Sequence, residues 1–85
     1  MKINVKYFAA LREAVGTGQE QLDLPPEVAT VGAVRDLLRA RGGVWADALA
    51  PERAVRMACQ QVMCRGETPV PDGAEVAFFP PVTGG

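Results

Sequence analysis

With 85 residues, the chain is long enough for one small domain. Hydrophobic residues make up 48% of it, so we expect a packed core, and 9 lysines and arginines against 10 aspartates and glutamates leave a net charge of -1. That charge balance excludes a polycation that holds nucleic acid by counterion release. The sequence shows neither a signal peptide nor a run of roughly 20 apolar residues, which favours a cytoplasmic protein without a membrane partner.

The N-terminal quarter of the chain predicts two strands around a short helix. Segment 2–8 alternates with the period of a half-buried strand, and segment 9–15 consists of good helix formers that end at Gly16. Segment 19–24 alternates again and stops at Pro25-Pro26, which predicts a second strand paired with the first. In the first strand one face carries Ile3, Val5 and Tyr7, and the other carries Asn4, Lys6 and Phe8.

One main helix follows. Thr30 is suited to cap a helix that runs to about Ala40, and Gly42-Gly43 ends it. Its apolar positions recur at spacings of three and four, at Val31, Val34, Leu37 and Leu38. We interpret Arg35, Asp36 and Arg39 as its solvated face, with no site implied. A further turn over 44–49 should bring Trp45 into the core.

Segment 53–64 predicts two strands that are separated near Gln60-Gln61. Cys59 and Cys64 lie in this segment, and the chain contains no histidine that could complete a zinc site with them. Two cysteines this close do not form a disulfide framework, and cysteine is often a small buried hydrophobic residue. We therefore expect no metal site and no sulfur-relay role for either thiol.

The last strand is predicted over 75–79, after a turn at Pro71-Asp72-Gly73. Val76 and Phe78 share one of its faces, and Phe79 lies on the other. With the first and last strands central and parallel, the order of elements predicts an α+β fold, a β-grasp (ubiquitin-like) domain over 1–85 in which one main helix packs on a mixed sheet. Parity then places Phe8 and Phe79 on the face opposite the helix, as an apolar patch for a partner, with Met63 beside them if its strand register agrees.

The tail over 80–85 has two contrasting halves. Pro80-Pro81 ends the strand and holds the start of the tail extended, because proline lacks an N–H and fixes φ. Gly84-Gly85 has no Cβ, so it can enter a channel that excludes other residues. From Pro81 to Gly85 an extended chain reaches roughly 15–17 Å. The tail is therefore predicted to project and to present its α-carboxylate as the reactive group.

Two segments carry a more specific pattern, namely 7–13 (YFAALRE) with Gly16 after it, and 72–85 (DGAEVAFFPPVTGG). Together they resemble the small subunits of molybdopterin synthase, a family of ubiquitin-like sulfur carriers. The resemblance spans nearly the whole chain. Members of that family commonly have Asn-Gln where this chain has Gln60-Gln61, which leaves the geometry of that turn open.

The resemblance implies a carrier that works only with partners. An E1-like, ATP-dependent adenylyltransferase adenylates Gly85, and a sulfur donor protein converts it to a thiocarboxylate. The large subunit of the synthase then receives the tail, in a heterotetramer of two small and two large subunits. Sulfur passes to cyclic pyranopterin monophosphate in molybdenum cofactor biosynthesis. With no bound cofactor and no histidine, the chain should not be catalytic alone.

The resemblance also assigns roles by position. Gly85 carries the sulfur and Gly84 is its spacer. The inserted stalk consists of Pro80, Pro81, Val82 and Thr83. Phe8, Met63 and Phe79 contact the large subunit.

Three other functions stay open from the residues alone. A sulfur carrier for thiazole or for a tRNA base would also end in Gly-Gly. A covalent protein modifier would join Gly85 to lysines, as ubiquitin does. A non-covalent binding module would use only the open sheet face, so it would not need Gly84 or Gly85.

Overall fold

Eight elements build residues 1–80, the part of the chain that this computed structural model describes. The strands are β1 (Lys2–Tyr7), β2 (Gln19–Asp23), β3 (Arg56–Cys59), β4 (Val62–Cys64) and β5 (Glu75–Phe79). The helices are α1 (Ala9–Val15), α2 (Val31–Arg39) and α3 (Gly43–Ala48). Each predicted element is present, and most of them begin and end within one or two residues of their predicted bounds.

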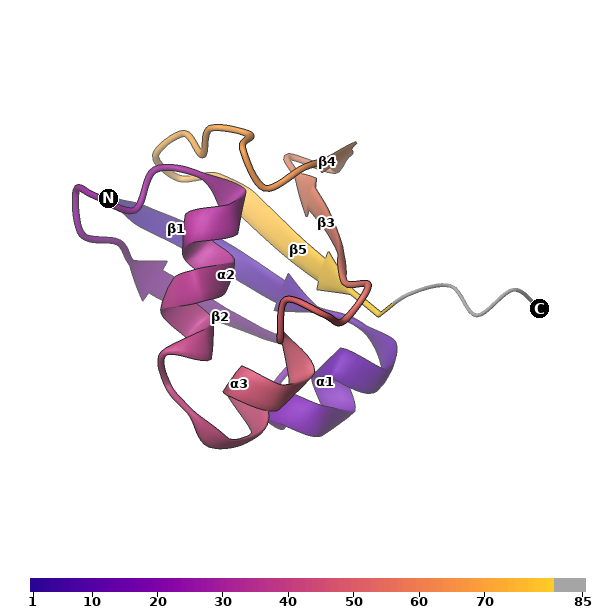
Figure 1. The fold of residues 1–85 in the computed structure, drawn as a ribbon. Helices are drawn as coiled ribbons and strands as arrows, with labels where there is room; N and C mark the ends of the chain where they lie inside the picture. Colours follow the sequence, from indigo (N-terminus) through magenta and orange to yellow (C-terminus); the bar gives the residue numbers. More distant parts are fainter. Residues whose placement is uncertain (81–85) are drawn as a thin grey trace.

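The five strands form one mixed sheet in the order β2-β1-β5-β3-β4. β1 and β5 are central and parallel, with Val5 opposite Val76 and Tyr7 opposite Phe78, and the other pairs are antiparallel. Figure 1 shows α2 crossing one face of this sheet, with α1 and α3 beside its lower end. The predicted β-grasp fold is confirmed.

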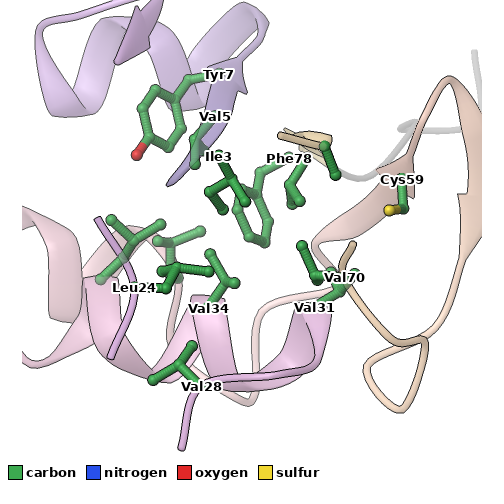
Figure 2. Packing of buried hydrophobic residues seen from close by; sticks show 14 of the residues in the cluster. Ile3, Val5, Tyr7, Leu24, Val28, Val31, Val34, Cys59, Val70 and Phe78 are labelled. Atoms are coloured by element: carbon green, nitrogen blue, oxygen red, sulfur yellow. The ribbon is translucent and has the colours of Figure 1, made fainter. Parts of the chain in front are cut away.

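The core lies between α2 and the central strands (Figure 2). Its largest fully buried side chains come from these elements and from Leu49, which follows α3, namely Tyr7, Phe78, Leu38, Leu49, Val5, Val31, Val34 and Val76. The alternation in β1 and β5 and the spacing in α2 therefore identify the packed faces correctly. Trp45 was predicted to enter the core; it is half-buried and packs against the core, with its ring edge-on to Tyr7 at 5.4 Å between centroids.

The predicted caps explain where the first two helices begin and end. Gly16 follows α1 with a left-handed φ of 81°, and its N–H donates to the carbonyl of Arg12. Thr30 Oγ1 accepts from the N–H of Ala33 at 3.1 Å. The hydroxyl thus satisfies one of the free donors in the first turn of α2.

The solvated-face interpretation of α2 is wrong for Arg35. Its Nε donates to the carbonyl of Leu49 at 2.8 Å, and Nη2 donates to those of Ala50 at 2.6 Å and Arg53 at 3.1 Å. Burial of this half-buried guanidinium lowers its pKa. Arg35 therefore ties α2 to the connection between α3 and β3, because main-chain carbonyls far along the chain accept from it.

The turn between β3 and β4 adopts left-handed backbone at both residues, with φ of 53° at Gln60 and 66° at Gln61. Two left-handed residues are the signature of a type I′ hairpin turn. Gln60 is held in place because its N–H donates to the carbonyl of Glu75 and its Oε1 accepts from the N–H of Glu75. The turn geometry that the sequence left open is thus a tight two-residue turn, which fixes the register of β4.

A close backbone contact between α2 and the loop after β4 predicts a stability effect. The N–H of Gly32 donates to the carbonyl of Gly66 at 2.8 Å, and a Cβ at position 32 would lie 2.9 Å from that oxygen. We expect Gly32→Ala to lower the free energy of unfolding by about 1–3 kcal/mol, because backbone atoms must shift. A Cβ at Gly66 would meet its nearest neighbour at 3.5 Å, an ordinary contact, so Gly66→Ala is the matched control. Urea unfolding measures both, and equal stabilities would contradict the close contact.

An ion-paired network links β1, β2 and the segment after α2. Tyr7 Oη donates to Glu20 Oε2 at 2.8 Å, and Arg41 donates to both Glu20 oxygens at 2.8 and 2.9 Å. The Arg41 guanidinium also lies 4.4 Å from the centroid of the Trp45 ring. The hydrogen bonds from Arg41 lower the pKa of Glu20, although its partial burial opposes the shift. Burial, together with the bond to Glu20, raises the pKa of Tyr7.

This network predicts a pH-dependent loss of stability. Because the pKa of Glu20 is lower in the folded state, its contribution is present above the ordinary value of 4.5 and is lost as the pH falls through the lowered value. We expect Glu20→Gln to cost about 1–2 kcal/mol at neutral pH and to make the acid dependence of unfolding shallower. The exposed Glu27 has no side-chain bond among the described residues, so Glu27→Gln is the control. Identical acid profiles for Glu20→Gln and the parent chain would contradict this account.

Candidate functional site at the open face of the sheet

The strand register places five apolar side chains on the sheet face that points away from α2. Phe79 lies beside β3 opposite Arg56, Ala77 pairs with Ala58, and Ala58 pairs with Met63. Directly paired residues share a face of a sheet. Met63 is therefore on the same face as Phe79, so the strand register agrees with its predicted place beside Phe8 and Phe79. We call this set the open-face patch: Phe8, Ala58, Met63, Ala77 and Phe79.

Phe8 joins the patch because the chain stays extended for one residue beyond β1. It has φ of -122° and ψ of 152°, and its N–H donates to the carbonyl of Phe78 at 3.2 Å. Its side chain therefore points to the face opposite that of Tyr7. The Phe8 and Phe79 rings stack at 4.7 Å between centroids with 9° between their planes. The sequence-predicted pairing of these two residues on one face is confirmed.

Two residues of the patch are open to a partner, since Phe8 is 39% exposed and Met63 is 51% exposed. Phe79 is half-buried, and Ala58 and Ala77 are buried. A polar rim borders the patch, where Lys6 Nζ lies 3.0 Å from Glu75 Oε1. An apolar centre with a charged rim is the ordinary anatomy of a protein–protein interface.

Pro80 is the last residue that the structure describes, and it is half-buried at the end of β5. It adjoins a hollow that α1 and α3 line with Ala10, Leu11, Ala14 and Ala48. The other predicted site residues of the tail lie outside the described residues, namely Pro81, Val82, Thr83, Gly84 and Gly85. Their roles stay predictions.

Neither cysteine offers a reactive thiolate. Cys59 is buried and Cys64 is half-buried, and burial raises the pKa of both thiols. Within residues 1–80 no group of three or more histidine, cysteine or acidic side chains could hold a metal ion. In the same part of the chain no helix is long and apolar enough to cross a membrane.

The comparison with protein families decides the family. The model described as "ThiS family" matches residues 5–85, nearly the whole chain. The chain belongs to the ThiS family.

Among the relatives of this ThiS-family chain are two proteins named "Molybdopterin synthase sulfur carrier subunit". The one from Haemophilus influenzae is 42% identical and the one from Escherichia coli is 41% identical, each over 98% of this chain and 99% of the relative. The resemblance seen in the sequence is confirmed. Among solved structures, SAMP1 from Haloferax volcanii superposes with a TM-score of 0.80 at 26% identity, over all of both chains. That likeness also supports the β-grasp fold.

Sequence reasoning about this ThiS-family chain placed Lys6 on the face of Phe8, but it missed Arg56 beside the patch and the ion pair between Lys6 and Glu75. Arg56 lies next to Phe79 across β3 and β5, and Lys6 reaches Glu75 from the neighbouring strand. Alternation from Ala58 places Arg56 on the open face, and that signal was in the sequence. The position of Arg56 opposite Phe79 could not be predicted from the sequence, because cross-strand neighbours depend on the register of the strands.

Proposed function

We propose that this chain is the sulfur carrier subunit of a molybdopterin synthase, and that Gly85 carries the sulfur as a thiocarboxylate. The observation that carries the proposal is the 41–42% identity, over nearly full length, to two proteins that bear this name. The open-face patch supports it, because a carrier must dock on each partner that charges or discharges its tail.

The proposed chemistry follows from the weakness of a carboxylate as an electrophile. The Gly85 carboxylate attacks the α-phosphorus of ATP on an E1-like adenylyltransferase, and pyrophosphate leaves. A sulfur donor protein then supplies sulfur at the oxidation level of sulfide, which attacks the acyl carbon to form the C–S bond, and AMP leaves with one oxygen of the former carboxylate. The product is a soft thiocarboxylate nucleophile that acts on cyclic pyranopterin monophosphate in the large subunit.

In this proposal the catalytic groups belong to the partners. The chain has no histidine, and both thiols have raised pKa values. What the domain supplies is position: β5 ends at Phe79, on the open-face patch, and the proposal assigns residues 80–83 the role of the stalk that carries the two glycines to the partner. The Gly84-Gly85 end then enters a narrow active site that a side chain would block.

Complementation tests the proposed function. The chain is expressed with its own large subunit and activating enzyme in a strain that lacks molybdopterin synthase, and the activity of a molybdenum enzyme is measured. We expect activity from the full chain and none from the 1–83 truncation, which keeps the domain. Equal activity from both would contradict the proposal, as would rescue only of a strain that lacks its thiazole sulfur carrier.

A second candidate, a covalent protein modifier, is favoured by one observation. SAMP1, the small archaeal modifier protein 1 of Haloferax volcanii, superposes over the full length of this chain. Conjugates of higher mass on a denaturing gel, present with the full chain and absent with the 1–83 truncation, would support this role.

A further inference from the structure

A second surface feature adjoins the open-face patch, at the end of the sheet where β3 begins and β4 ends. It is a hollow whose apolar lining comes from Val55, Met57 and Met63, and whose charged lining is Arg56 and Arg65. Met63 belongs to both the hollow and the patch, and Arg56 lies opposite Phe79. The hollow is therefore continuous with the surface that the proposed function uses for docking.

The two arginines line the same hollow at the end of the hairpin. β3 and β4 pair Met57 with Cys64, and Arg56 and Arg65 are the residues directly outside that pair, one before Met57 and one after Cys64. Like charges that share one hollow repel each other. This arrangement favours an anion in the hollow, because an anion offsets that repulsion.

Within the described part of the chain neither arginine forms an ion pair, although Glu67 lies near the hollow, where its charge adds to the effect of burial in raising the pKa of the Cys64 thiol. The ion pairs found within residues 1–80 use the N-terminal amine, Lys6 and the guanidinium groups of Arg39, Arg41 and Arg53. Neither Arg56 nor Arg65 contacts a carboxylate there, both are exposed, and no acidic residue lines the hollow. This is a local cationic site on a chain whose net charge is -1.

We propose that this hollow binds an aspartate or glutamate side chain of the large subunit that receives the tail, a proposal that rests on the proposed function above. A guanidinium group presents donors in a fork that fits a carboxylate, and two of them facing one hollow fit an acidic partner residue. The apolar lining receives the methylene groups of that side chain. The hollow thereby sets the rotation of the partner about the apolar patch, since a charge contact at the rim defines a register that stacked rings alone do not.

The test is the affinity of the chain for the large subunit of its own organism, measured by calorimetry over a range of salt concentrations. We expect Arg56→Gln/Arg65→Gln to weaken binding roughly three- to tenfold at low salt, and to make the dependence of Kd on salt shallower. Arg56→Lys/Arg65→Lys keeps both charges and should keep the salt dependence. Lys2→Gln removes one charge at the far end of the same sheet face and should leave Kd within about twofold.

The outcomes separate this inference from the proposed function. If the unaltered chain binds and Phe79→Ala weakens it, but Arg56→Gln/Arg65→Gln binds with unchanged Kd and salt dependence, the hollow is not an acidic-partner site. Failure of the unaltered chain to bind would instead reject the proposed function. Saturable binding of inorganic phosphate to the free chain, lost in Arg56→Gln/Arg65→Gln while the affinity for the large subunit stays unchanged, would assign the hollow to a small anion and overturn the proposal.

Discussion

One alanine appended after Gly85 should abolish cofactor synthesis. The extension moves the terminal carboxylate by roughly 3.3–3.6 Å and adds a Cβ to a tip that has none. A displacement of about 1 Å at a reacting centre already costs about a hundredfold in rate, so we expect activity to fall by more than that. The measurement is sulfur transfer to cyclic pyranopterin monophosphate by the assembled synthase.

The control for this variant is the domain itself. The extended chain should keep the thermal melting temperature of the parent chain, because the domain is unchanged, and it should still bind the large subunit through the open-face patch. Intact mass must show that the added residue is retained during the assay. Full activity of an untrimmed extended chain would show that the terminal backbone position is not the reactive one.

Two adjacent phenylalanines should give opposite results when each is changed to alanine. Phe78 is 0% exposed and packs in the core under α2, so Phe78→Ala should lower the free energy of unfolding by about 3–5 kcal/mol. Phe79 is stacked on the exposed Phe8 on the other face, so Phe79→Ala should have little effect on stability. It should weaken binding to the large subunit by roughly 2 kcal/mol or more, about thirtyfold, if Phe79 is an interface anchor.

Each variant is the control for the other, since the substitution is the same and only the face of β5 differs. Chemical unfolding gives the stability of both, and calorimetry with the large subunit gives the affinity of Phe79→Ala. A melting temperature that falls as far for Phe79→Ala as for Phe78→Ala would show that Phe79 belongs to the core. Unchanged affinity for Phe79→Ala would remove the open-face patch from the interface.

Local patterns were sufficient to predict most of the fold. Alternation in β1 and β5 identified the buried faces, Thr30 and Gly16 marked helix ends, and the residue order predicted two central parallel strands. These signals depend on neighbours in the sequence, so a single chain contains them. The stacked Phe8 and Phe79 were predictable for the same reason, because parity needs only the strand direction.

Features that depend on distant partners were not predictable. Arg35 appeared solvated in the helical pattern, but its acceptors are carbonyls 14–18 residues further along the chain. The partner of Glu20, Arg41, lies 21 residues away. Arg56 and Arg65 line one hollow because of the tight turn at Gln60-Gln61. Glutamine does not predict that turn, since left-handed backbone favours glycine or asparagine.

The most direct test of the central claim is the intact mass of the chain after incubation with its activating enzyme, ATP and a sulfur donor. Replacement of one carboxylate oxygen by sulfur should raise the mass by about 16 Da, and fragmentation should place the gain on Gly85. The 1–83 truncation should show no gain. A full-length chain that binds its activating enzyme yet keeps its original mass, or that gains sulfur at Cys59 or Cys64 instead, would contradict the account.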